Sequence, residues 1–131
     1  MCRKDDRMNK RILVIEDQED LRGVLRDLFT SSGYDVIEAV DGAAGVARAK
    51  FDRPDIILMD IQMPVIDGYE ATRQIKADPN LTSIPIVAVS SFAMKGDEEK
   101  ARAAGCDDYV TKPYSPIQLL RMVRGYLARN A

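Results

Sequence analysis

The segment PDIILMDIQMPVIDGYE occupies residues 54–70 and contains the pattern from which the fold can be argued. Its start, Asp55–Met59, is a short and nearly continuous run of large apolar residues. Such runs are typical of strands in a parallel sheet that helices cover on both faces. Asp60 follows this run directly, so a carboxylate is expected where the strand ends.

Four further segments on either side of this one have strand character. Arg11–Glu16 (RILVIE) and Pro85–Ser90 (PIVAVS) are equally apolar and rich in β-branched residues. Asp35–Val40 (DVIEAV) and Asp108–Thr111 (DYVT) are shorter and more mixed, as strands at the edge of a sheet often are. Five strands are therefore expected, with the most apolar ones in the middle.

Helical patterns lie between these strands. The first predicted helix has one buried stripe and a stop signal at Gly33, and the stripe consists of Leu21, Val24, Leu25, Leu28 and Phe29. A second helix, which ends before Pro54, is marked by Ala43, Val46, Ala47 and Ala49. The last helix is marked by Leu119, Leu120, Val123 and Leu127. Asp97–Ala104 has a helical composition but only alanines to bury, so we expect it to be held loosely.

Alternating strands and helices predict an α/β fold, in which a doubly wound, five-stranded parallel sheet and five helices form three layers. At 131 residues the chain has room for one domain, which we place at residues 10–131 after a flexible N-terminal tail of residues 1–9. An apolar fraction of 46% is sufficient for a core.

Charge and residue usage exclude several classes of function. A net charge of −2 and the absence of a Lys/Arg block argue against direct binding of nucleic acid. No apolar run is long enough for membrane insertion, and the polar start does not resemble a signal peptide, so a cytoplasmic location is expected. Cys2 and Cys106 are expected to be free thiols. The absence of histidine excludes a Ser-His-Asp triad, a His-based zinc site and a phosphohistidine within this chain.

Polar residues with chemical potential follow the predicted strands. In α/β sheets, ligands bind at the carboxyl ends of the strands, and these ends carry Glu16, Asp17, Asp60, Ser90 and Lys112. Three carboxylates near one ammonium would repel one another, and Mg²⁺ prefers such oxygen ligands. A carboxylate can attack phosphorus to form an acyl phosphate, and Asp60, nearest the middle of the sheet, is the expected nucleophile. Lys112 and Ser90 are suited to pair with phosphate oxygens.

The same residues resemble the receiver domain of two-component response regulators, a CheY-like family. The resemblance covers about Lys10 to Arg129, and the matching segments are ILVIEDQED, PDIILMDIQMPVIDGYE, IPIVAVSSFA and DDYVTKPYS. It departs from the family pattern in having Glu at the first acidic position and Ser in place of Thr at the switch position. It implies the flavodoxin-like strand order 2-1-3-4-5 and a cis peptide bond between Lys112 and Pro113.

Carried over residue by residue, the resemblance implies a role for each site residue. Asp60 would be the phosphoacceptor and Lys112 the invariant lysine, while Ser90 and Tyr109 would be the switch residues. Mg²⁺ would be held by Asp17, by Asp60, by Glu16 through water, and by the backbone carbonyl of Gln62. Gln62 and Phe92 are placed where they would tune the access of water to the phosphate.

The implied function is that of a stand-alone receiver of the DivK type in a two-component phosphorelay. The alternative is a receiver excised from a hybrid histidine kinase. The phosphoryl group would come from a phosphohistidine on a histidine kinase or a histidine phosphotransfer protein. The chain would not be an enzyme beyond self-catalysed phosphoryl transfer and autodephosphorylation.

We expect the signal to leave through a change of surface, because no output domain follows in the sequence. On phosphorylation Ser90 would be drawn inward, Tyr109 would turn in, and the segment Ala93–Ala104 would shift. The downstream protein would bind the face formed by the fourth helix, fifth strand and fifth helix. Candidate contacts on that face are Met94, Tyr114, Met122 and Tyr126.

Three other classes of function fit these residues less well. A flavin or nucleotide binder would want a glycine-rich loop after the first strand, where Glu16 and Asp17 stand instead. A phosphatase of the haloacid dehalogenase type would want two aspartates two residues apart, which Asp60-Ile61-Gln62 does not provide. A scaffold that takes no phosphate has no need of an intact set of acidic residues with a lysine.

Overall fold

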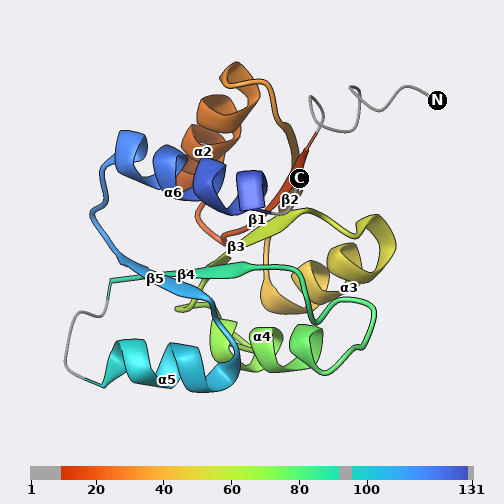
Figure 1. Cartoon of the computed structure of the whole chain (residues 1–131). Helices are drawn as coiled ribbons and strands as arrows, with labels where there is room; N and C mark the ends of the chain where they lie inside the picture. The colour runs from red at the N-terminus through yellow and green to blue at the C-terminus, as the bar shows by residue number, and fades with distance from the viewer. Residues whose placement is uncertain (1–9, 92–95, 130–131) are drawn as a thin grey trace.

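The computed structural model describes residues 10–91 and 96–129, so the predicted tail of residues 1–9 lies outside the described residues. Five strands form one parallel sheet in the order β2-β1-β3-β4-β5 (Figure 1). Their bounds are β1 Arg11–Ile15, β2 Asp35–Ala39, β3 Ile56–Asp60, β4 Ile86–Ser90 and β5 Asp108–Thr111. The predicted fold class and strand order are confirmed, and the two mixed strands are the edge strands.

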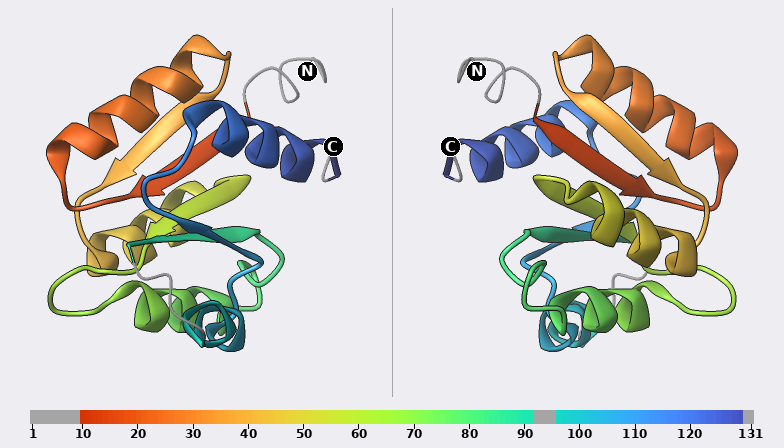
Figure 2. Two further views of the ribbon diagram at one scale, coloured as in Figure 1. Left: turned by 90° about the vertical axis from the view of Figure 1, so that its left-hand side faces the viewer. Right: turned by 90° about the vertical axis from the view of Figure 1, so that its right-hand side faces the viewer.

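Five helices cover the two faces of the sheet. Helices α2 and α6 lie on one face, and α3, α4 and α5 lie on the other (Figures 1 and 2). Their bounds are α2 Glu19–Ser31, α3 Gly42–Asp52, α4 Gly68–Lys76, α5 Asp97–Ala104 and α6 Pro116–Arg129. Helix α4 has no predicted residue range from the sequence. Within the described ranges, no helix combines the length and apolar character needed to span a bilayer.

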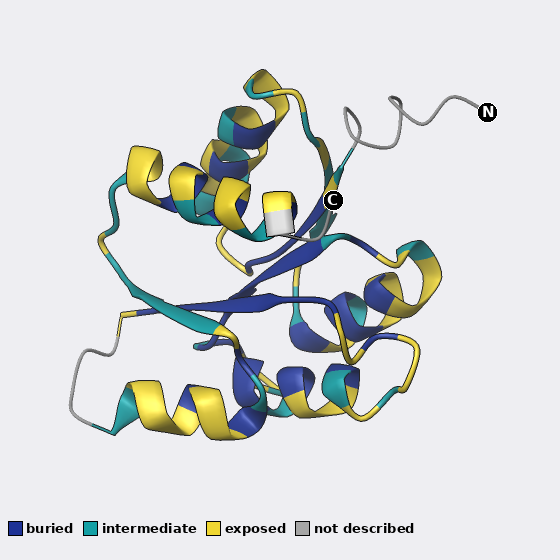
Figure 3. Ribbon diagram, in the orientation of Figure 1, coloured by how far each residue is buried: buried dark blue, intermediate teal, exposed yellow. Residues whose placement is uncertain are grey.

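The core is divided by the sheet into two apolar clusters, because successive side chains of a strand point to opposite faces. In β1, Ile12 and Val14 pack toward α2 and α6, whereas Leu13 and Ile15 pack toward the other three helices. Burial on both faces explains why the central strands read as continuous apolar runs. Figure 3 shows these central strands as buried and the outer surfaces of the helices as exposed.

One predicted helix face was partly wrong: Val24 was placed in the buried stripe of α2, but it is 51% exposed. The helix marked by Ala43, Val46, Ala47 and Ala49 is confirmed as α3. It meets the sheet through Gly42, Gly45, Val46 and Ala49, while Ala43 and Ala47 are exposed. A Cβ atom on Gly45 would collide with Cδ1 of Ile15, so α3 approaches β1 as closely as a glycine permits. A search for large apolar residues misses such a contact.

Helix α5 agrees with the expectation of a lightly anchored segment. It spans the predicted residues, and its buried residues are Ala101 and Ala104. Burial of two methyl groups stabilises a helix far less than burial of Leu or Phe side chains does. Cys106, just beyond α5, is a buried free thiol, while Cys2 lies outside the described residues.

Candidate functional site

The residues expected at the carboxyl edge of the sheet come together there. Asp60 and Ser90 are the last residues of β3 and β4, Glu16 and Asp17 follow β1, and Lys112 follows β5. One carboxylate oxygen from each of the three acidic residues lies within 4.8 Å of the others. Glu16 and Asp60 are each 3% exposed, whereas Asp17 is exposed to solvent. The parallel sheet thus collects groups that are up to 96 positions apart in the chain.

One ammonium group binds both buried carboxylates. The Lys112 Nζ atom lies 3.3 Å from Oε1 of Glu16 and 3.5 Å from Oδ1 of Asp60. Each carboxylate also accepts a backbone hydrogen bond from the residue two positions later, at 3.1 Å from Gln18 N and 3.2 Å from Gln62 N. These hydrogen bonds orient the two carboxylates. Because backbone N–H groups carry no net charge, the cluster still has more negative than positive charge.

The environment of Asp60 favours its neutral form. Burial and the adjacent Glu16 carboxylate raise the pKa of Asp60 from its ordinary value of 3.8 to about 7, against the opposing effects of Lys112 and the Gln62 N–H. A buried carboxylate with this pKa is typical of sites where a cation or a reaction supplies compensating charge.

The cluster fits a divalent cation with a preference for oxygen ligands. Its three carboxylates face a single lysine, their oxygens are close enough to share one ion, and Asp17 on the open side is accessible to solvent. Mg²⁺ commonly binds one or two protein carboxylates and keeps several waters. The role of the Gln62 carbonyl stays a prediction.

Of the two switch candidates, Ser90 ends β4 at the same edge of the sheet, whereas Tyr109 lies further back on β5, opposite Ala88. Ser90 is fully buried, and its carbonyl oxygen accepts a hydrogen bond of 2.7 Å from Lys112 N, so β4 positions the lysine. The Gln62 side chain accepts a hydrogen bond of 2.8 Å from Ser91 N, which joins the loops after β3 and β4. Tyr109, half-buried on β5, packs against the cluster that α4 and α5 cover. Phe92 lies outside the described residues.

The loop after β3 is held in place by two residues that our sequence analysis did not assign. Asp67 caps α4, where its side chain accepts a hydrogen bond of 3.0 Å from Glu70 N. Gly68 N donates to the Ile61 carbonyl, and a Cβ atom on Gly68 would lie 2.5 Å from the carbonyl oxygen of Asp60. The signal that was available is the Asp-Gly pair before a helix, since Gly allows the backbone to approach Asp60 closely.

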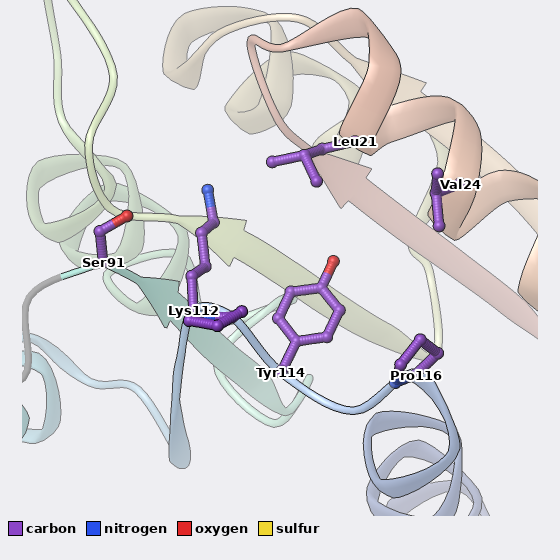
Figure 4. A pocket seen from close by; sticks show the side chains of 7 residues that line it. Leu21, Val24, Ser91, Lys112, Tyr114 and Pro116 are labelled. Carbon is purple, nitrogen blue, oxygen red and sulfur yellow. The ribbon is translucent and has the colours of Figure 1, made fainter.

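An apolar cavity of about 400 Å³ lies beside the acidic cluster (Figure 4). It is lined by Leu21, Val24, Ser91, Lys112, Pro113, Tyr114 and Pro116. Figure 4 shows α2 and the segment after β5 on opposite sides of it. Since both line this cavity, the exposed Val24 and half-exposed Leu21 belong to a surface next to the site and not to the core. The predicted cis peptide bond between Lys112 and Pro113, in the same lining, is confirmed.

Comparisons with known proteins agree with this architecture. The family model of the response regulator receiver domain matches residues 12–124. The chain therefore belongs to the family of response regulator receiver domains, the switches of two-component signal transduction.

Individual relatives refine this placement. The chain is 42% identical over 120 residues to the polar-differentiation response regulator DivK of Brucella anthropi, and the match covers 92% of this chain and 98% of DivK. The receiver domain of a sensor histidine kinase from Pseudomonas aeruginosa is 38% identical, with a TM-score of 0.85 over 92% of this chain and 98% of that one. That crystal structure has a magnesium ion coordinated in its active site cleft. A receiver domain from Francisella is 26% identical over 94% of this chain and all of the other, with a TM-score of 0.86.

The raised pKa of Asp60 predicts how stability depends on pH without Mg²⁺. The native protein retains the Asp60 proton up to pH of about 7, whereas the unfolded chain releases it near 3.8, so stability falls as pH rises between these values. We expect Asp60→Asn to be more stable than the wild type by about 2 kcal/mol at pH 8 and equal to it near pH 4. Urea unfolding in EDTA across this range measures the difference. A difference that does not change with pH would contradict this account.

Proposed function

We propose that this receiver accepts a phosphoryl group on Asp60 with Mg²⁺ bound at Glu16, Asp17 and Asp60. The proposal rests mainly on the position of Asp60. It is the last residue of the central strand β3, and its carboxylate lies beside Glu16 and the Lys112 ammonium. The crystal structure of the receiver from Pseudomonas aeruginosa, with magnesium in its cleft, supports the choice of metal.

In the proposed reaction an Asp60 carboxylate oxygen attacks phosphorus on a phosphohistidine of the donor. The new bond joins this oxygen to phosphorus, the phosphorus–nitrogen bond breaks, and its electron pair stays on the imidazole, which takes a proton. Lys112 is near enough to the attacking carboxylate to pair with a phosphate oxygen, and the buried Ser90 hydroxyl is a candidate donor to another. Bound Mg²⁺ would neutralise the charge that spreads over the phosphoryl oxygens. The chain is thereby a switch that is modified once per cycle and not a turnover enzyme.

Labelling with a small phosphodonor tests this proposal. Wild-type protein incubated with Mg²⁺ and acetyl phosphate should gain one phosphoryl group by intact mass, because the site assembles without a partner. Asp60→Asn should gain none, and Asp17→Asn should need more Mg²⁺. Asp55→Asn is the matched control, since Asp55 lies at the opposite end of β3 and should leave labelling intact. Equal labelling of wild type and Asp60→Asn would refute the assignment.

The donor is proposed to be a histidine kinase or a histidine phosphotransfer protein. These 131 residues contain no histidine, so a phosphohistidine donor has to lie outside them. Asp60 is 3% exposed, so a protein donor has to lie against the rim of the site. The apolar cavity beside Lys112, with Val24 on one wall and Tyr114 on the other, offers such a contact. We propose that it contacts the surface of the donor around its phosphohistidine.

A charged residue in this cavity should slow transfer from the protein donor only. Val24→Lys places an ammonium on the apolar wall at a half-exposed position, so folding should be preserved. We expect transfer from a phosphorylated histidine phosphotransfer protein to slow by roughly tenfold or more, with labelling by acetyl phosphate retained. Phe51→Lys is the control, because Phe51 is 81% exposed on α3 outside this cavity. Equal transfer rates for both variants would contradict the proposed surface.

We propose that the signal leaves through the face formed by α5, β5 and α6, the fourth helix, fifth strand and fifth helix of the sequence prediction. A cleft of about 300 Å³ opens there between β5 and α6, with Tyr109, Tyr114 and Met122 among its lining residues. Tyr126 donates hydrogen bonds to the Asp107 carbonyl and, at 3.1 Å, to Asp108. Met94 lies outside the described residues. Phosphate at Asp60 would draw in Ser90, Tyr109 would follow, and the lightly anchored α5 would shift.

Amide hydrogen exchange tests this switch. Phosphorylation by acetyl phosphate should change the rate of amide hydrogen exchange in residues 96–104 of the wild type. The reason is that α5 buries little apolar surface against the sheet. Ser90→Ala lacks the hydroxyl and Tyr109→Ala lacks the ring, so both should be labelled on Asp60 and show at most a third of the wild-type change. Intact mass measures labelling in the same samples. A full wild-type change in both variants would rule out this route.

The physiological context of the chain is proposed from its relatives. The match to DivK covers nearly all of that response regulator, which favours a stand-alone receiver over a receiver excised from a hybrid kinase. A cytoplasmic location is part of the same proposal. Detection of the native protein in cell extracts by an antibody, at the size of 131 residues or of a much longer chain, separates the two arrangements.

A further inference from the structure

Arg22 of α2 joins the acidic loop to the neighbouring strand. Its Nη1 atom donates a 2.9 Å hydrogen bond to the Glu16 carbonyl oxygen, and its Nε atom donates a 3.1 Å bond to Oε1 of Glu38 on β2. The side chain is only 14% exposed. A guanidinium group can hold two acceptors in a fixed geometry, which a lysine cannot do. Arg22 therefore ties the backbone after β1 to an edge strand of the sheet.

The bond to the Glu16 carbonyl fixes the residue that follows. This carbonyl belongs to the planar peptide unit that joins Glu16 to Asp17, so holding its oxygen sets the orientation in which Asp17 leaves β1. Glu16 N is held as well, by a 3.1 Å bond to the Ala39 carbonyl on β2. Within the described part of the chain, the exposed Asp17 carboxylate has no hydrogen bond or ion pair of its own. Its direction therefore depends on its backbone.

We propose that Arg22 is a positioning residue for Mg²⁺, which it favours by fixing the Glu16–Asp17 peptide so that both carboxylates face Asp60. This inference rests on the proposed function of the site and adds a positioning residue to it. Residues that orient metal ligands commonly change metal affinity by 10-fold or more when they are mutated. Arg22 has no predicted role from the sequence, because an arginine in the first turns of a helix has the pattern of a surface cation.

The charge of Arg22 acts in the opposite direction. A guanidinium near an acidic cluster repels Mg²⁺, so loss of its charge alone would tighten binding. Loss of positioning weakens binding instead. The sign of the change in affinity therefore separates a positioning role from a purely electrostatic one, and a general loss of stability can be followed by thermal unfolding.

The test is Mg²⁺ titration calorimetry on the unphosphorylated protein. We expect Arg22→Ala to bind Mg²⁺ roughly 5- to 10-fold more weakly than the wild type. Arg22→Lys keeps the charge but not the two-acceptor geometry, so it should also bind more weakly, and it serves if Arg22→Ala does not fold. Arg26→Ala is the matched control: Arg26 also pairs with Glu38, at 3.4 Å, but is half-exposed and does not reach Glu16. It should keep wild-type affinity or bind slightly more tightly.

A second measurement uses acetyl phosphate. For Arg22→Ala, the Mg²⁺ concentration that gives half-maximal labelling of Asp60 should rise by the same factor, while labelling at saturating Mg²⁺ should equal that of the wild type. Unchanged or tighter Mg²⁺ binding by both Arg22 variants would overturn the inference, as would an equal loss in Arg26→Ala. Normal Mg²⁺ binding without labelling of the wild type would instead refute the proposed function and leave the calorimetric test of Arg22 valid.

Discussion

Glu16 and Asp60, two carboxylates that water hardly reaches, lie side by side and share the ammonium group of Lys112. One cation cannot balance both of them and Asp17 as well, so the edge of the sheet carries an excess of negative charge. Burial first, and then the adjacent Glu16 carboxylate, raise the pKa of Asp60. The surrounding structure maintains this arrangement, because two carboxylates in a less rigid setting would move apart into water and return to their ordinary pKa. A divalent cation with a preference for oxygen ligands would balance that excess.

Rigidity comes from the apolar sheet below the site. The strands β1, β3 and β4 are buried on both faces, so their ends cannot move independently of the core. Residues near the rim then fix the details. Gly68 lets the loop after β3 approach the Asp60 backbone, and Arg22 holds the peptide between Glu16 and Asp17. The cluster is therefore preorganised before any ligand binds, which reduces the cost of binding one.

Around this rigid centre the structure has parts that are held less firmly. Helix α5 is anchored by two alanines, and β5 is half-buried along its whole length. The apolar cavity with Val24 on its wall adjoins Lys112 on the side of α2, whereas α5 lies on the opposite face of the sheet. A shift of α5 would therefore not require the acidic rim or the cavity beside α2 to be rebuilt.

The class of fold, the order of its elements and the residues at the carboxyl edge could all be predicted from the sequence, because local patterns of apolar and polar residues indicate which strands are buried and where they end. The sequence did not determine the distances among Glu16, Asp60 and Lys112, the exposure of Val24, the glycine contacts of α3 or the link from Arg22 to Glu16. These features depend on how the helices pack on the sheet, and this packing depends on contacts between residues that are far apart in the chain. Asp60 was recognisable as a strand-end carboxylate, but only the tertiary structure shows that its burial and its neighbours give it an unusual pKa.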